Sequence, residues 1–314
     1  MLDLKSFKKE FVTQCRNTLC EFGAEDMKIE ERKVNKAQRG MLNGVLFKKD
    51  GLGCAPTFYV EDFYKAYRDG TPITDLSRDA VDAAVRSMDM ARRLARKSSD
   101  MLRDPGNLRV RMLSMGRNKG YLKGIPYREL GCGFVYIAEM GSGEYGAVIT
   151  DALMEDYEMT RDELFDKAIR NTAENFPAVL QDLAESACGR PEECNNLLDP
   201  KASWTPAGAV PAFVLTNSRF FWGAGAIFYP GVIERIHELL GGDFYVLPSS
   251  VHELIIMAVE DQDPQQLADL VRSANREVVA ENEILSDDLY ICKSGKLCRV
   301  SYGGVIPACG CNVC

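Results

Sequence analysis

Hydrophobic and polar residues alternate along the chain with two different periods. In residues 4–20, apolar side chains recur at helical spacing between charged residues, which predicts an amphipathic helix. The same pattern is longest over residues 76–102, and "DPGN" ends it. By contrast, "DMKIEERKVNK" alternates apolar with charged residues, and "GVLFKKDG" follows after a turn-rich segment. These two segments predict a pair of antiparallel strands.

The segment "CAPTFYVEDFYKAYRDG" begins with a strand pattern and changes to a helix pattern that ends at Gly70. The helical part carries an aromatic face with Phe63, Tyr64 and Tyr67. We expect these rings to pack the helix against the sheet, because aromatic side chains bury a large apolar area. An aromatic helix face would also suit the docking of a partner.

The middle of the chain combines a clear helix start with a candidate linker. Thr160 is suited to the N-cap position, and Glu163 completes the spacing of a capping box. Pro177 interrupts the helical pattern, and a second helical piece is expected up to Cys188. The segment "GRPEECNNLLDPKASWTPAGAVP" is rich in turn-forming residues, and it predicts a linker or long loop at about residue 205.

The last third of the chain contains short strands and helices in turn. "AFVLTN" and "DFYVLP" each predict an apolar strand, and a helix is expected from about Tyr229 to Leu240. "HELIIMAV" fits either a further strand or a turn of helix. Asp263 followed by Pro264 is typical of a helix start, and "DDLYICKSGKLCRVS" predicts a hairpin.

Because strands and helices are interleaved irregularly, the sequence predicts an α+β fold with mixed, largely antiparallel sheets packed with helices. With 314 residues, 46% of them hydrophobic, the chain can bury one large core or two modest ones. We predict an N-terminal α+β region over residues 1–200. A C-terminal α+β region over residues 201–300 is expected to pack with it as one unit, followed by a cysteine-rich tail over residues 301–314.

The charge balance excludes some classes of partner. The net charge is −8 and the isoelectric point is about 5.1. A general nucleic-acid binder needs a basic excess, so that class is excluded, and contact with anionic membranes is disfavoured. Docking on a basic partner is the less favoured hypothesis. The N-terminus has no signal-peptide core, and no apolar run reaches the length of a membrane span. We therefore expect a cytoplasmic protein without a membrane segment.

Several segments carry a resemblance to a known family. These are "PTFYVEDFYKAYRDG", "VLTN", "VLPSSVHELII" and "ILSDDLY". Together they resemble a family of uncharacterised proteins that is common in gut Firmicutes, often on mobile elements, and is named as a domain of unknown function. The resemblance covers roughly residues 5–295. It implies a cytoplasmic bacterial setting and supplies no catalytic residues.

A polar site is predicted where two apolar segments end. His252 and Glu253 follow "VLPSS", and Asn217 ends "AFVLTN" beside the small residues "GAGA". If these bends meet, Asn217, His252 and Glu253 form a small polar pocket, to which Asp287 or Asp288 adds a carboxylate. Ser249 and Ser250 would bring hydroxyl groups near an imidazole. The alternatives are that His252 orders the turn by bonding a backbone carbonyl, and that Asn217 with Thr216 caps the following helix.

The metal and cofactor predictions concern the tail. "CGCNVC" places Cys309, Cys311 and Cys314 at the spacing of a zinc knuckle half, so these thiolates are candidate zinc ligands. The second knuckle is missing, which leaves a frayed or oxidised tail as the alternative. A zincin is excluded because neither His237 nor His252 has a second histidine four residues later. We expect no cofactor besides this candidate zinc.

Two hypotheses about function follow. The first is a binding or regulatory protein, associated with mobile elements, which acts on a protein partner or a small molecule. It rests on the lack of a complete catalytic motif, the acidic charge and the aromatic helix face. The second is an enzyme, a hydrolase or transferase, that uses the polar pocket around Asn217, His252 and Glu253.

Overall fold

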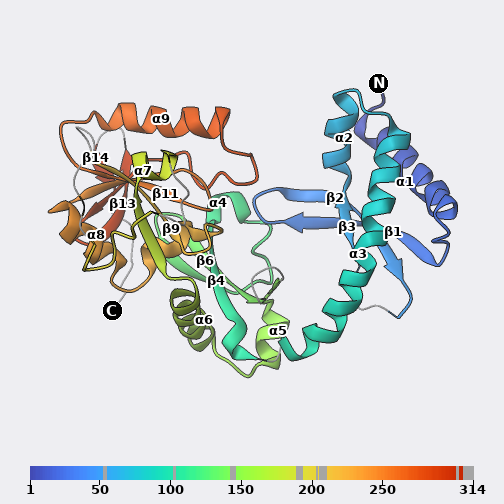
Figure 1. The fold of residues 1–314 in the computed structure, drawn as a ribbon, viewed down its shortest axis with the longest axis horizontal. Helices are drawn as coiled ribbons and strands as arrows, with labels where there is room; N and C mark the ends of the chain where they lie inside the picture. Colours follow the sequence, from blue (N-terminus) through green and yellow to red (C-terminus); the bar gives the residue numbers. More distant parts are fainter. Residues whose placement is uncertain are drawn as a thin grey trace. The chain divides into compact units, whose positions relative to one another are not determined.

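The chain forms two compact units, Met1–Arg103 and Asp104–Cys314, which we call unit 1 and unit 2 (Figure 1). The structure is a computed structural model. It describes residues 1–51, 55–101, 104–141, 146–188, 194–202, 204, 211–301 and 304–306. The predicted boundary lies at residue 200, whereas the compact units divide near residue 103.

Unit 1 packs three helices with a three-stranded antiparallel sheet of order β1-β2-β3 (Figure 1). Its elements are α1 (Leu4–Glu21), β1 (Met27–Lys36), β2 (Gly40–Lys49), β3 (Thr57–Tyr59), α2 (Val60–Arg68) and α3 (Ile73–Met101). The expected aromatic face of α2 is partly buried and packs against the core of unit 1. Tyr67 contacts Phe7 of α1 with ring centroids 5.0 Å apart, and Phe63 contacts Phe11 at 4.8 Å. These rings join α2 to α1 as well as to the sheet.

Unit 2 contains two sheets in which every described strand pair is antiparallel. Its first half consists of η1 (Pro105–Asn107), β4 (Leu108–Ser114), α4 (Met115–Asn118), β5 (Tyr127–Gly131), β6 (Phe134–Gly141), β7 (Gly146–Val148), α5 (Asp151–Asp156) and α6 (Arg161–Asn175). Strand β6 lies between β4 and β5 and also pairs with β7. Residues 142–145, which connect β6 to β7, lie outside the described part.

The second half of unit 2 builds a larger sheet, of order β14-β13-β12-β10-β11-β9-β8 in the described residues. Its elements are β8 (Ala178–Asp182), α7 (Leu183–Cys188), β9 (Ala212–Asn217), η3 (Gly223–Phe228), α8 (Val232–Leu240), β10 (Phe244–Pro248), β11 (Leu254–Ala258), α9 (Pro264–Glu277), β12 (Tyr290–Lys293), β13 (Lys296–Ser301) and β14 (Gly304–Ile306). The α+β prediction with largely antiparallel sheets is therefore confirmed.

The central strands of this sheet are buried on both faces. Tyr245 and Leu247 of β10 pack against α9, whose Leu267 belongs to the same apolar cluster. Helix α9 crosses this side of the sheet in Figure 1. Phe244 and Val246 point to the opposite face and are also buried. Burial on both faces explains why "DFYVLP" is a continuous apolar run rather than an alternating one.

The prediction of a second helical piece after Pro177 was wrong over its first half. Residues Ala178–Asp182 form β8, which pairs with β9 from Ala178↔Asn217 to Asp182↔Phe213. Only α7, Leu183–Cys188, is helical. A short apolar run fits the helical period and the strand period equally well. Here the run forms a strand because its backbone pairs with the edge of β9. Because β8 precedes residue 200 and β9 follows it, this pairing crosses the predicted boundary between the two regions.

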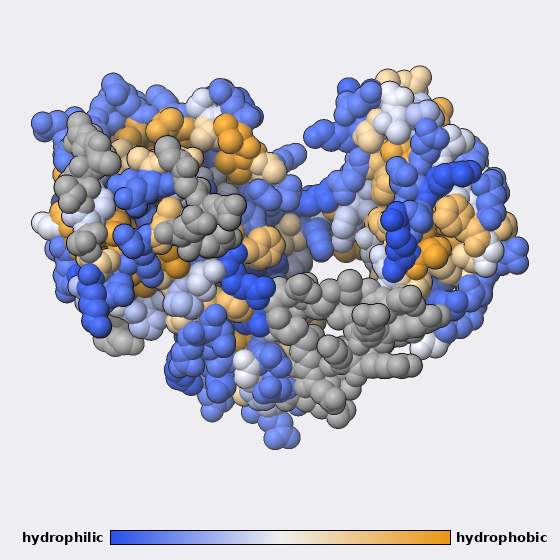
Figure 2. Space-filling model, viewed as in Figure 1, coloured by the Kyte–Doolittle hydropathy of each residue, from blue (hydrophilic) through white to orange (hydrophobic). Residues whose placement is uncertain are grey.

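Hydrophilic residues cover most of the described surface in the view of Figure 2, with hydrophobic residues in smaller areas between them. Single exposed apolar side chains are ordinary on a protein surface. Among the described helices, none combines the length and apolar character that crossing a membrane requires.

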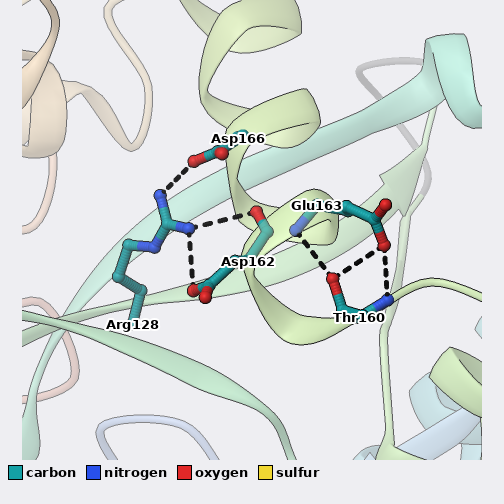
Figure 3. Close-up of polar contacts among 5 residues, drawn as sticks. All are labelled: Arg128, Thr160, Asp162, Glu163 and Asp166. Atoms are coloured by element: carbon teal, nitrogen blue, oxygen red, sulfur yellow. Dashed lines mark hydrogen bonds and ion pairs between the residues drawn. The ribbon is translucent and has the colours of Figure 1, made fainter.

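The start of α6 confirms the predicted capping box (Figure 3). The Thr160 hydroxyl accepts a hydrogen bond from the backbone N–H of Glu163, and the Glu163 carboxylate accepts one from the backbone N–H of Thr160 at 2.9 Å. The Thr160 hydroxyl also bonds the Glu163 carboxylate at 2.7 Å, and this bond, together with that from the Thr160 backbone N–H, holds the pKa of Glu163 below its usual value. Arg128 of β5 pairs with Asp166 at 2.7 Å, which ties the helix start to the sheet.

Replacing Thr160 by Ala should destabilise unit 2 by about 1 kcal/mol, because the N-cap acceptor is lost. Both tryptophans of the chain, Trp204 and Trp222, lie in unit 2, so their fluorescence during urea unfolding reports on this unit. Thr160→Ser retains the hydroxyl and should keep the wild-type midpoint. Equal midpoints for the Ala and Ser variants would contradict the capping role.

Candidate functional site

The register of the large sheet brings the two predicted bends to one end of it. Leu215 of β9 pairs with Leu254 of β11, and Leu254 also pairs with Pro248 of β10. The residues after Leu215 therefore lie beside the residues before Leu254. This register places the Asn217 turn next to the bend that contains His252, as the sequence predicted.

The two bends are joined by hydrogen bonds to one carbonyl group. The carbonyl oxygen of His252 accepts from the Thr216 hydroxyl at 2.8 Å and from the backbone N–H of Gly223 at 3.0 Å. The contact is so close that a Cβ on Gly223 would lie 2.2 Å from Thr216 Oγ1 and 2.8 Å from the His252 oxygen. Only glycine fits at this position.

The imidazole of His252 is also bound to the backbone. Its Nδ1 accepts the backbone N–H of Trp222 at 3.0 Å, so the neutral ring carries its proton on Nε2. Nε2 lies 3.5 Å from the Glu283 carboxylate. Phe221 packs on the same ring with a centroid distance of 4.8 Å. His252 thus positions the Phe221–Trp222 segment. It orders the turn, as the alternative interpretation expected, but it bonds a backbone N–H group and not a carbonyl.

The Asn217 side chain binds the same segment from the other side. Its Nδ2 donates to the carbonyl of Phe221 at 3.0 Å, and its Oδ1 accepts the backbone N–H of Arg219 at 3.0 Å. It also bonds the hydroxyl of Tyr229, whose pKa is raised by burial and partly lowered again by this bond. Asn217 therefore orders the turn that follows β9.

The remaining predicted site residues have other contacts. The Ser250 hydroxyl accepts the backbone N–H of His252 at 3.0 Å and so shapes the bend. Glu253 contributes its backbone carbonyl, which accepts from the N–H of Ser250. Asp287 pairs with Arg117 at 3.2 Å and accepts from Asn275, while Asp288 pairs with Arg299 at 3.3 Å. A catalytic role for Asn217, His252 and Glu253 stays a prediction.

The turn after β9 holds its backbone in an unfavourable conformation. Phe220 and Trp222 have φ values of 55° and 54°, in the left-handed region that bulky residues avoid. Each such residue costs roughly 1–3 kcal/mol, and backbone strain of this kind is concentrated at ligand-binding and active sites. Between them lies Phe221, whose side chain is 55% exposed. The fold therefore maintains a strained turn that displays one aromatic ring.

Three arginines that sequence reasoning missed lie around this turn. Arg111 of β4 stacks on the Trp222 ring at 4.3 Å, and Arg109 of β4 and Arg219 both stack on the Phe176 ring, at 4.5 and 5.3 Å. We call the set the arginine–aromatic surface; it comprises Arg109, Arg111, Phe176, Arg219, Phe221 and Trp222. One signal was available, since "RVR" in a strand places Arg109 and Arg111 on the same face.

The charges on this surface are not balanced locally. Arg111 pairs with Glu139 at 2.7 Å. Within the described residues, neither Arg109 nor Arg219 has a carboxylate at ion-pair distance. Burial lowers the pKa of Arg109, the like charge of Arg219 lowers it further, and Glu139 raises it. The three arginines outnumber the neighbouring carboxylates of Glu139 and Glu283, so these groups leave a positive excess on a chain with a net charge of −8.

No three His, Cys, Asp or Glu side chains among the described residues gather closely enough to hold a metal ion. The candidate zinc ligands Cys309, Cys311 and Cys314 lie outside the described part, so zinc binding at the tail stays a prediction. Cys292 is buried in β12, which raises the pKa of its thiol to about 12. A thiol with such a pKa is a poor metal ligand and nucleophile at neutral pH.

Comparison with known proteins confirms the resemblance to an uncharacterised family. Residues 5–294 match the family model DUF5688, which is described as a family of unknown function. No match was found among curated proteins or among solved structures. The bacterial source, the mobile-element setting and the cytoplasmic location that the sequence suggested stay predictions.

Replacing Gly223 by Ala should destabilise unit 2 by about 1–3 kcal/mol, because the new methyl group overlaps Thr216 and the His252 carbonyl. Urea unfolding followed by tryptophan fluorescence measures the effect. Gly242→Ala is the matched control, since nothing lies within 4 Å of a Cβ there and its φ is not positive. A Gly223→Ala protein as stable as Gly242→Ala would show that the two bends are not in contact.

Proposed function

The chain belongs to the DUF5688 family of unknown function, and from this premise we propose that it is a binding protein which recognises a segment of a partner protein through its arginine–aromatic surface. The observation that carries the proposal is the exposed Phe221 ring on a strained and firmly bonded turn. Partner binding would explain why the fold retains the backbone strain at Phe220 and Trp222.

The turn is rigid, which suits an anchor residue. The backbone around Phe221 is held by Asn217 at its carbonyl and by the His252 ring at the following N–H. A ring that is already fixed loses little conformational entropy when a partner covers it. Aromatic and arginine side chains are also the residue types that contribute most to binding energy at protein interfaces.

The same bonds argue for binding rather than for hydrolysis or group transfer. A general base needs a free lone pair near the substrate, but the Nδ1 lone pair of His252 accepts from Trp222. The amide of Asn217 is bonded at both ends to its own turn. The Ser250 hydroxyl bonds the backbone N–H of His252. These polar groups maintain the turn and thereby the display of Phe221.

A protein segment suits this surface better than a compact ligand. The rings and guanidinium groups come from β4, the end of α6 and the turn after β9. They form a series of neighbouring contacts from Phe221 through Trp222 and Arg111. An extended chain can contact several of these groups at once, with one apolar side chain against the exposed ring.

Phe221→Ser should abolish partner recognition while leaving unit 2 folded. A library of random twelve-residue peptides displayed on phage is selected against the wild-type protein, and enriched peptides are synthesised with a fluorescent label. Fluorescence anisotropy should show at least tenfold weaker binding to Phe221→Ser, because the anchor ring is lost. The urea midpoint should change little, since the ring is largely exposed.

Leu270→Ser is the matched control, because Leu270 of α9 is exposed to 56% and lies outside the arginine–aromatic surface. It should bind every selected peptide with wild-type affinity. The proposed function is wrong if no peptide is enriched, or if the enriched peptides bind the Phe221 and Leu270 variants equally well.

A further inference from the structure

We infer that the recognised segment is acidic, and that Arg109 and Arg219 together bind one of its carboxylate groups. This inference rests on the proposed function of the same surface and specifies the chemistry of the partner. It reverses the less favoured hypothesis of a basic partner, which the net charge alone had suggested. The relevant charge is that of the surface in contact, and there it is positive.

The first support is the contrast between the arginines. Arg111 forms an ion pair with Glu139 of the same chain, at 2.7 Å. Arg109 and Arg219 have none at ion-pair distance among the described residues, although Arg109 is half-buried. Partly buried arginines are usually paired, because their five N–H groups need acceptors. A carboxylate from outside the chain would supply what Glu139 supplies to Arg111.

The second support is the position of the two groups. Phe176 follows the last residue of α6, and its ring carries both guanidinium groups, at 4.5 and 5.3 Å. Both guanidinium groups thereby lie over one ring, and like charges in this position repel; burial and then the charge of Arg219 lower the pKa of Arg109. An oxyanion between them relieves the repulsion and forms charge-assisted hydrogen bonds with both.

The third support is the short distance along the chain from Arg219 to Phe221. Only Phe220 separates them, and the turn is fixed by Asn217. A partner segment that places an apolar side chain on Phe221 therefore passes Arg219 within a few residues, at about 3.3 Å per extended residue. We expect an Asp or Glu within about three residues of the apolar anchor.

The experiment uses the full-length protein and the peptides selected as above. Each enriched peptide is compared with a version in which its Asp or Glu is replaced by Asn or Gln. The neutral peptide should bind wild-type protein roughly tenfold or more weakly, because a hydrogen-bonded charge is lost. Arg219→Gln should weaken the acidic peptide to the same degree and leave the neutral peptide unchanged, which demonstrates coupling between the two groups.

Two further variants make the result specific. Arg276→Gln removes an exposed arginine of α9 and should bind like the wild type. Arg109→Lys keeps the charge but loses the planar fork, so it should weaken acidic peptides more than neutral ones. Added sodium chloride should reduce the affinity of the wild type for acidic peptides more than that of Arg219→Gln.

The outcomes separate this inference from the proposed function. Peptides that depend on Phe221 but show no excess of Asp or Glu, and bind Arg219→Gln normally, would overturn the acidic-partner inference alone. Peptides that depend on neither Phe221 nor Arg219 would overturn the proposed function as well. If acidic peptides bind Arg219→Gln and Arg276→Gln equally weakly, the loss reflects general electrostatic attraction and not a specific contact with Arg219. This result would also overturn the inference.

Discussion

At Gly223 the chain passes so close to Thr216 and to the carbonyl of His252 that no side-chain carbon has space. This contact joins two turns that are about 30 residues apart in the sequence. It can form only because β9 and β11 are paired neighbours whose register brings both turns to one end of the sheet. The position of Trp222, and with it the display of Phe221, depends on this close approach.

The side chains of His252 and Asn217 have the same structural role next to this contact. Each uses its side chain to satisfy backbone groups of the turn from Arg219 to Trp222. Buried or half-buried backbone groups need partners, and in this turn the side chains of Asn217 and His252 supply several of them. The local energy cost at Phe220 and Trp222 is therefore offset by fixed polar contacts. A turn held by several hydrogen bonds, with one exposed ring, is the result.

The positive charge of the surface comes from β4 as well as from this turn. Arg109 and Arg111 belong to β4, Phe176 follows α6, and Arg219 follows β9. Stacking on aromatic rings keeps these guanidinium groups in place. A chain with an acidic net charge can thus carry a basic contact surface, because the net charge averages over residues that are not near one another.

The sequence by itself determined the features that depend on neighbours within a few residues. The capping box of Thr160 and Glu163, the helix start at Asp263 and the strand "AFVLTN" all follow from local bonding or apolar period. It also indicated that the Asn217 and His252 bends meet. Only the tertiary structure decided that residues after Pro177 form a strand and that Arg109, Phe176 and Arg219 come together. Such contacts join distant segments, and strand pairing and burial select them through energies that local patterns do not contain.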